Sequence, residues 1–212
     1  SNTRGMHWLD PDVDKGPSAW NTPQTFSANA SLDLPFGPGR RFGSGAAGAW
    51  GKVIEGWQLN TLLRLADGPA VEINQGGNRM CNFCDERPDL IPGKTNRPNT
   101  GSPNRWFGDP SDNFEPSERG YFGTLGRNTA IGPGIATVDI SILKSVSVGE
   151  ATRVQFRAEF FNVFNRTNFH PPERSRESFG RGSGTHANAS FGAIFETATT
   201  ARQIQLALRI DF

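Results

Sequence analysis

The sequence predicts an all-β fold of about five antiparallel strands with the length and pattern of transmembrane barrel strands. The closing stretch, residues 202–212, alternates apolar and polar residues with the period of two that is typical of a strand. The same alternation recurs near 25–34, 56–66, 136–146 and 152–163. Strands of about 9–11 residues cross the hydrocarbon layer of a membrane when they are tilted. These stretches therefore predict part of a membrane barrel.

Composition supports a chain rich in turns. Among 212 residues there are 25 Gly and 15 Pro, spread along the sequence, which argues against long helices. No window approaches 18 apolar residues, so no transmembrane helix is expected. Lys and Arg number 22 against 21 Asp and Glu, a balance that implies no polycationic surface for nucleic acid. A chain of this length forms one domain or two small ones.

Each predicted strand has one apolar and one polar face, with Leu62 as the misfit. The apolar positions are Phe26, Ala28, Ala30, Leu32 and Leu34; Trp57, Leu59, Thr61, Leu63 and Leu65; Val138, Ile140 and Ile142; Val154, Phe156, Ala158 and Phe160; Ile204, Leu206, Leu208, Ile210 and Phe212. In a soluble sandwich these faces would form a core. In a membrane barrel they would face lipid, and the polar faces would line a wet lumen.

Connection lengths alternate in a way that predicts an orientation. The connections at 35–55 and 146–152 are the shorter ones, and those at 68–134 and 165–195 are long. Bacterial barrels have short periplasmic turns and long external loops. We therefore expect the short connections and Phe212 on the periplasmic side. The polar start, Ser1–Gly5, has no signal-peptide pattern, so an exported protein would contain this chain as a mature or internal piece.

Charged residues on the polar faces are candidates for a lumen network. They are Arg64, Asp139, Arg157, Glu159 and Arg209. In a globular protein they would be solvated surface charges. The barrel interpretation is favoured because the opposite faces are too apolar to be left in water. At the short-turn rim, Trp57 and Phe212 suit the membrane interface, and Lys144 suits a lysine that extends toward the headgroups.

The charges also predict a register for the hairpin formed by residues 136–146 and 152–163. With a turn centred on Val148, Ile142 would pair with Val154, and Asp139 would lie opposite Arg157. Sliding one strand by two residues can set Asp139 opposite Glu159, where like charges repel. We therefore predict an Asp139–Arg157 cross-strand pair.

Residues that could carry chemistry are few. Cys81 and Cys84 most simply form a local disulfide in an exported loop, with a metal site or free thiols as alternatives. Zinc would need two more ligands, and His7, His170 and His186 lack ligand spacing. The Gly-rich run at 43–48 formally matches a dinucleotide fingerprint, but a Pro/Gly turn precedes it and Gly51 argues against a following helix. No enzyme motif appears, so no catalytic residue, cofactor or metal is predicted.

Several motifs, in order along nearly the whole chain, resemble TonB-dependent outer-membrane receptors of the Oar-like group, which carry a carboxypeptidase-regulatory-like domain. The motifs are Leu34-Pro35-Phe36-Gly37 with Arg40-Arg41-Phe42; Gly56-Trp57-Gln58-Leu59; Gly126-Arg127-Asn128 with Gly132-Pro133-Gly134; Val138-Asp139-Ile140-Ser141 with Lys144; Phe156-Arg157-Ala158-Glu159-Phe160-Phe161-Asn162-Val163-Phe164-Asn165; and Arg202-Gln203-Ile204-Gln205-Leu206-Ala207-Leu208. Residues 70–125 match least.

The resemblance implies the carboxyl-terminal portion of a barrel of about 22 strands that takes up a scarce ligand. It implies as partners the rest of the barrel, a plug, TonB acting through that plug, outer-membrane lipid, and the barrel-assembly machinery. That machinery would read Leu206, Leu208, Ile210 and Phe212. Nothing in the sequence resembles a plug, and about five strands cannot close alone, since the smallest bacterial barrels have about eight.

Two other functions remain open at this point. One is a soluble β-sandwich binding module, which buffer or high salt would release from membranes. The other is a structural or scaffold component of an outer-membrane assembly, whose long loops bind neighbours. The identity of the ligand is not encoded in these motifs.

Overall fold

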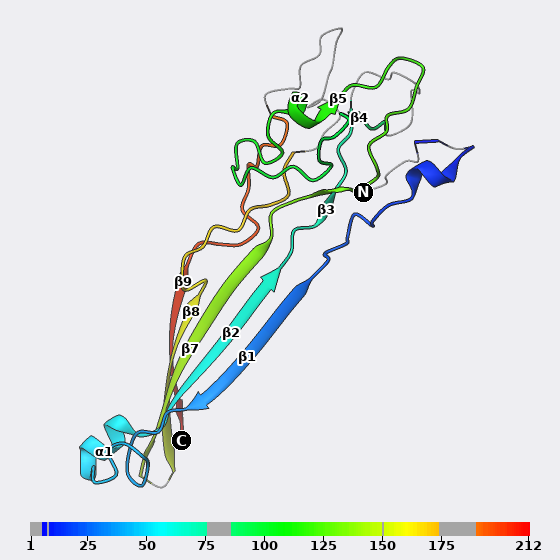
Figure 1. The fold of residues 1–212 in the computed structure, drawn as a ribbon. Coiled ribbons are helices and arrows are strands. Elements are labelled where there is room, and N and C mark those ends of the chain that lie inside the picture. Colours follow the sequence, from blue (N-terminus) through cyan, green and yellow to red (C-terminus); the bar gives the residue numbers. More distant parts are fainter. Residues whose placement is uncertain (1–5, 8, 76–85, 150, 174–189) are drawn as a thin grey trace. The chain divides into compact units, whose positions relative to one another are not determined.

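The structure is a computed structural model that describes residues 6–7, 9–75, 86–149, 151–173 and 190–212. The chain divides into two compact units, and each is described by itself (Figure 1). The sheet unit comprises Thr25–Leu65, Ala136–Thr167 and Thr199–Phe212. The loop unit comprises Ser1–Gln24, Ala66–Ile135 and Asn168–Ala198.

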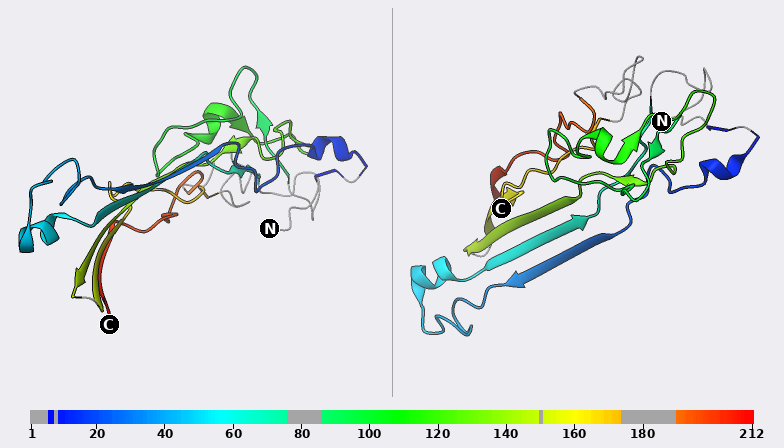
Figure 2. Two further views of the ribbon diagram at one scale, coloured as in Figure 1. Left: turned by 90° about the horizontal axis from the view of Figure 1, so that it is seen from below. Right: turned by 45° about the horizontal axis from the view of Figure 1, so that its top comes forward.

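The sheet unit is built on one five-stranded sheet in the order β1-β2-β7-β8-β9, which Figure 2 shows as twisted. The strands are β1 (Thr25–Asp33), β2 (Trp57–Ala66), β7 (Ile135–Val148), β8 (Thr152–Phe161) and β9 (Gln203–Asp211). Each lies at one of the five alternating stretches of the sequence. The all-β fold class is therefore confirmed. No helix in the described ranges is long and apolar enough to cross a membrane.

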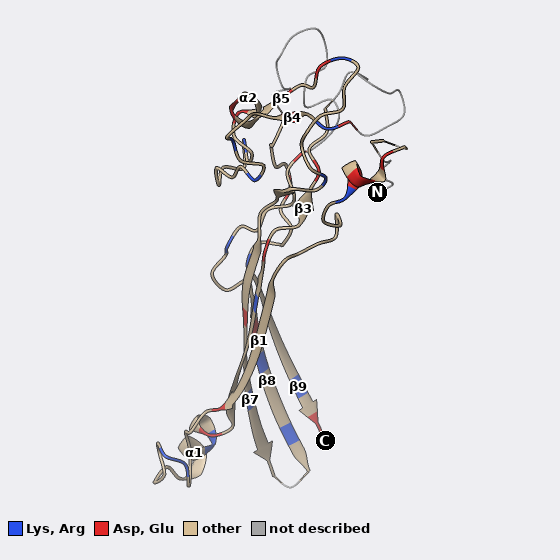
Figure 3. Cartoon of the chain, turned by 45° about the vertical axis from the view of Figure 1, so that its right-hand side comes forward, with Lys and Arg blue, Asp and Glu red and all other residues tan. Residues whose placement is uncertain are grey.

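The apolar positions of neighbouring strands lie beside one another. In the antiparallel β8–β9 ladder, Phe156 pairs with Leu208, Ala158 with Leu206, and Phe160 with Ile204. Leu206 and Leu208 are nonetheless about two-thirds exposed, at 68% and 66%. Charged side chains interrupt the strands only sparsely (Figure 3). Across β8 and β9 the sheet thus presents an apolar face that no described part of the chain covers at Leu206 and Leu208.

The register of the β7–β8 hairpin differs from the predicted one. Ile142 pairs with Ala158 rather than Val154, and the position opposite Arg157 is Leu143. The predicted Asp139–Arg157 pair is therefore wrong. Strand β7 continues to Val148, which pairs with Thr152, so the connection is residues 149–151. The shift is an even number of residues, and for that reason every side chain keeps its predicted face.

Gly149 explains where this hairpin turns. Its φ is 73°, in the left-handed region that glycine adopts at little cost. The sequence-based turn centred on Val148 would have put a β-branched residue at the reversal, where such residues are strained. Asp139 has a different partner: its Oδ1 accepts the backbone N–H of Asn162 at 2.8 Å. It therefore accepts a backbone hydrogen bond at the end of β8 instead of pairing with the Arg157 side chain.

The shorter connection at 35–55 contains a helix that the sequence did not predict. Helix α1 spans Gly48–Ile54, and Gly51 lies inside it. A Cβ on Gly51 would be 3.2 Å from both Ala46 O and Pro38 Cγ, so glycine permits close packing of this turn. The expectation that Gly51 excludes a helix is wrong. The strand before the Gly-rich run is the exposed β1, which differs from the buried strand of a dinucleotide site.

Gly56 joins this connection to β2, and its replacement by Ala is expected to destabilise the sheet. Its φ is 69°, and an added Cβ would lie 2.4 Å from Ser145 O, while Ser145 N donates to Gly56 O at 3.0 Å. The left-handed conformation alone costs a non-glycine residue about 1–3 kcal/mol. We expect Gly56→Ala to lower the urea concentration at the midpoint of unfolding of the protein.

Gly39→Ala is the matched control for this prediction. Gly39 has a φ of 71°, but no atom lies within 4 Å of its added Cβ. It therefore bears the conformational cost without the collision. Equal shifts in the two variants would show that the close approach of Ser145 to Gly56 does not contribute.

The loop unit has a hydrophobic core of its own. Val71, Ile73, Trp106, Phe107, Phe114, Leu125, Ala130 and Phe191 form it. Its elements are a 3₁₀ helix η1 (Pro11–Asp14), β3 (Ala70–Val71), β4 (Asp89–Leu90), α2 (Pro110–Asn113), β5 (Phe114–Glu115) and β6 (Ala130–Ile131). β3 pairs with β6, and β4 with β5. The long connections therefore contain a packed unit rather than unstructured chain.

Candidate functional site

The polar face of the sheet carries the predicted charge network only in part. Arg157 Nη1 lies 3.8 Å from Glu159 Oε1, two residues along the same strand. Arg209 Nε instead bonds its neighbour Asp211 at 2.8 Å. Arg64 is exposed on β2, and Asp139 accepts from the backbone. The five residues share the polar side of the sheet, but they form local pairs rather than one connected cluster.

Uncharged polar groups accompany these charges on the same face. Gln58 Nε2 donates to Ser31 Oγ at 3.1 Å, which links β2 to β1. Asn29, Asn60 and Ser141 line a shallow hollow together with Asp139. A wall of amides, hydroxyls and scattered charges suits contact with water or with another polar surface, as in the lumen of a membrane barrel.

The predicted assembly signal at the end of β9 lies among the described residues, whereas the predicted cysteine pair does not. Leu206, Leu208 and Ile210 lie exposed on the apolar side of β9, and Phe212 is fully exposed. Cys81 and Cys84 lie outside the described residues, so their predicted disulfide stays a prediction. Within the described ranges, no group of three or more His, Cys, Asp or Glu residues could hold a metal ion.

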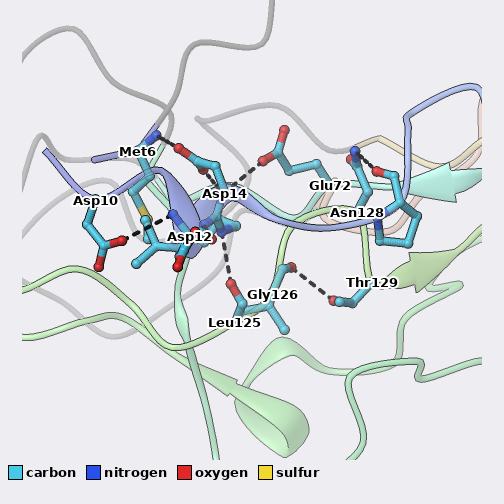
Figure 4. A network of polar contacts seen from close by, with 12 residues as sticks. Met6, Asp10, Asp12, Asp14, Glu72, Leu125, Gly126, Asn128 and Thr129 are labelled. Atoms are coloured by element: carbon cyan, nitrogen blue, oxygen red, sulfur yellow. Dashed lines mark hydrogen bonds and ion pairs between the residues drawn. The ribbon is translucent and has the colours of Figure 1, made fainter. Parts of the chain in front are cut away.

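A buried arginine, Arg87, organises the loop unit, and Figure 4 labels three of the residues that it contacts, Asp14, Glu72 and Leu125. Arg87 is 1% exposed, and its Nη1 lies 2.8 Å from Asp14 Oδ1 and 3.4 Å from Glu72 Oε1. Its other donors reach two backbone carbonyls, Val13 O at 2.6 Å and Leu125 O at 2.9 Å. A guanidinium suits this position because its planar fork offers several donors in fixed directions. One side chain thus joins η1, β3 and the segment before β6.

Asp14 is held in its charged form by this arrangement. Burial raises its pKa, but hydrogen bonds from Arg87 and from the Met6 and His7 backbone outweigh burial, so the pKa falls below the usual 3.8. Met6 N donates to Asp14 Oδ2 at 2.7 Å. A carboxylate with a lowered folded-state pKa stabilises the fold above its unfolded pKa, and this stabilisation is lost as the pH falls through the folded pKa.

We therefore expect the backbone of residues 9–15 to lose protection against hydrogen exchange in acid. Protection of this segment against hydrogen exchange should be constant from neutral pH to about pH 5 and then fall below about pH 4. Asp14→Asn should show reduced protection at neutral pH and little further change in acid. Asp109→Asn is the control, because Ser111 hydrogen bonds lower the pKa of Asp109 at an exposed site. If Asp14→Asn retains the native pH profile, this coupling is wrong.

The loop unit also contains a pocket that is a candidate for ligand binding. A pocket of about 630 Å³ is lined by Trp20, Pro69, His170, Pro172, Glu173, Phe195 and Glu196, among others. Trp20 and Phe195 are 87% and 74% exposed. Backbone bonds hold its walls: His170 N donates to Glu196 O at 3.0 Å, and Ala70 N to Asn21 O at 3.1 Å. The volume lies within the range of small-molecule sites.

This pocket was not predictable from the sequence. Its described walls come from separate parts of the chain, at residues 19–22, 69–71, 170–173 and 193–196. Each segment read singly is a polar loop with no periodicity. Exposed aromatic rings can stack on a flat or sugar-like ligand, and carboxylates can bind its hydroxyls or a cationic group. The chemistry fits a binding site, and none of the described lining residues forms a nucleophile–base pair.

Strands with one lipid-like face and one wet face, joined alternately by short and long connections, define the wall of a membrane β-barrel. Comparison with known families agrees: an outer membrane beta barrel domain matches residues 1–205, and the chain belongs to that family. The protein is therefore located in the bacterial outer membrane. Comparisons with curated proteins and with solved structures gave no match.

Proposed function

We propose that this chain is the carboxyl-terminal portion of a TonB-dependent receptor barrel that takes up a ligand from outside the cell. The observation that carries the proposal is the loop unit, which has its own core and a pocket of about 630 Å³. Capture of a scarce ligand requires a preformed external site, whereas a passive pore requires only an opening. The ordered series of receptor-like motifs supports the same function.

The edges of the sheet support a larger barrel. Strands β1 and β9 are the outer members of the described sheet, and each has backbone groups to pair with a neighbour. In lipid, open strand edges are excluded because their unpaired N–H and C=O groups cost several kcal/mol each. Further strands must therefore join both edges. We propose that they belong to a barrel of about 22 strands with a plug inside.

In this proposal the polar face contacts the plug, and energy arrives from TonB through that plug. The barrel-assembly machinery inserts the strands, and outer-membrane lipid surrounds the apolar face. The chain itself has no catalytic role. Binding in the loop unit would be the first step of uptake, before passage along the polar wall.

Planar bilayer recordings test the plugged receptor against a passive pore. The purified full-length protein should show no steady ion conductance, because a plug fills the lumen. Cells that lack the gene should also lose energy-dependent accumulation of at least one compound from a panel of iron chelates, cobalamin and oligosaccharides, and loss of TonB should have the same effect. Steady conductance with unchanged accumulation would contradict the proposal.

A structural or scaffold role predicts a different pattern in the same cells. Accumulation of every compound would be normal, while neighbouring outer-membrane proteins would be lost or displaced when the gene is deleted. A soluble sandwich would be released by high salt, and the full-length protein should instead require detergent.

A further inference from the structure

The connection at 35–55, which we call the rim segment, exposes an unusual set of side chains for a turn. Phe36, Phe42, Trp50 and Val53 are each between 42% and 65% exposed. Single exposed apolar residues are normal on protein surfaces, but a contiguous group indicates an interaction site. All four lie within one short connection of the sheet unit, on or next to α1.

Lys144 determines on which side of the sheet the rim segment lies. Lys144 lies at a position of β7 whose side chains point to the apolar side of the sheet, and it pairs with Phe156. Its Nζ donates to the backbone carbonyls of Lys52 and Glu55, at the end of α1, and lies 5.4 Å from the centre of the Trp57 ring. Trp57 Nε1 in turn donates to Val53 O at 3.0 Å. These contacts place the end of α1 against the apolar, lipid-facing side.

An apolar groove opens between the rim segment and the start of β2. Leu34, Phe36, Phe42, Val53, Ile54 and Trp57 line it, and its volume is about 460 Å³. The Phe36 and Phe42 rings lie 5.7 Å apart, centre to centre. The groove is continuous with the lipid-facing side because Trp57 belongs to both. A hydrocarbon chain can therefore enter it without crossing polar surface.

The connection that forms this groove also carries cationic side chains. Arg40, Arg41 and Lys52 are exposed, and the only acidic residue of the rim segment, Glu55, is half-buried. The Arg41 guanidinium lies 5.5 Å from the centre of the Phe42 ring. The Lys52 Nζ reaches Ser147 O at 3.3 Å, which holds this ammonium near the end of β7. Positive charge beside an apolar groove is complementary to a lipid with a negative headgroup.

We propose that the rim segment is a binding site for an anionic phospholipid of the adjacent membrane leaflet. Trp50 and Val53 enter the interfacial layer, an acyl chain occupies the groove, and Arg40 and Arg41 bind the headgroup phosphate. Guanidinium groups suit this role because they bind phosphate oxygens with two donors. The site would anchor the wall of the barrel at one depth. The proposal rests on the outer-membrane location and not on ligand uptake.

Photocrosslinking in the full-length protein identifies what contacts the rim segment. Benzoylphenylalanine at position 50 should crosslink to phospholipid in cells, as detected by mass spectrometry. The matched control is position 121 in the loop unit, since Tyr121 and Trp50 are both 65% exposed. Position 121 should give no phospholipid adduct. A protein adduct at position 50, or no adduct at all, would overturn the proposal.

Reconstitution tests the headgroup. In bilayers of equal parts phosphatidylcholine and phosphatidylglycerol, adducts at position 50 should be enriched in phosphatidylglycerol, with about fivefold enrichment for each cation involved. Arg40→Gln with Arg41→Gln should return the adducts to the bulk ratio. Lys94→Gln with Arg97→Gln removes two exposed cations from the loop unit and should change nothing. Adducts without phosphatidylglycerol enrichment would refute the anionic site.

These outcomes are separable from those of the uptake assay. The rim variants retain the loop-unit pocket, and failure of uptake would leave lipid adducts unchanged. Resistance of each variant to heat in gel electrophoresis reports whether the barrel has folded, so loss of the adducts can be assigned to the site itself.

Discussion

Arg87→Leu is expected to unfold much of the loop unit while leaving the barrel wall in the membrane. The substitution removes the guanidinium that bonds Asp14, Glu72, Val13 and Leu125, and it leaves the 2%-exposed Glu72 carboxylate without that cation. Removing one member of a buried ion pair costs about 3–5 kcal/mol. The free energy of unfolding of the loop unit should fall by that amount. Trypsin should then cleave the loop unit in intact cells.

Arg105→Leu is the matched control in the same unit. Arg105 also makes an ion pair, with Asp109 at 2.9 Å, but both side chains are about half exposed, at 55% and 49%. Exposed pairs contribute about 0–1 kcal/mol. Its protease resistance should therefore match that of the wild type. If both variants resist trypsin equally, the buried network does not hold this unit together.

Leu206→Arg should impair insertion of the barrel more than any substitution on the polar face. Leu206 lies in the middle of β9, opposite Ala158 of β8, and it is 68% exposed. Arg on the lipid face near the bilayer midplane costs about 2–4 kcal/mol. We expect the free energy of unfolding of the full-length protein in vesicles to fall by that amount. The level of the protein in the outer membrane of cells should fall as well.

Gln205→Arg tests whether the effect of Leu206→Arg depends on the face of the sheet that carries the charge. Gln205 precedes Leu206 and lies opposite Glu159 across the β8–β9 ladder, on the polar side. A guanidinium there stays wet and faces a carboxylate, so the folding free energy should change by less than about 1 kcal/mol. Equal losses at 205 and 206 would contradict the assignment of the two faces.

The alternation of side chains was sufficient to locate the strands and to assign their faces. A strand has a period of two residues, so the apolar residues of each strand share one side. Ile140, Phe160 and Ile204 lie on the same side of the sheet in any register that keeps these apolar faces together. The β7–β8 register was not determined in this way, because a slide by an even number of residues preserves both faces. The left-handed Gly149 decided it, together with the pairing of Val148 with Thr152.

The candidate sites depended still more on tertiary structure. The sequence placed Arg157 and Glu159 on the polar face, and their 3.8 Å pair follows from that placement. The sequence contained no local pattern that predicted the contact between Arg87 and Asp14, which are 73 residues apart. It also contained none that predicted the pocket walls at Trp20 and Phe195. Periodicity reports only which way neighbouring side chains point. Which distant segments meet is decided by chain packing, and a buried charge or a pocket exists only once those segments have met.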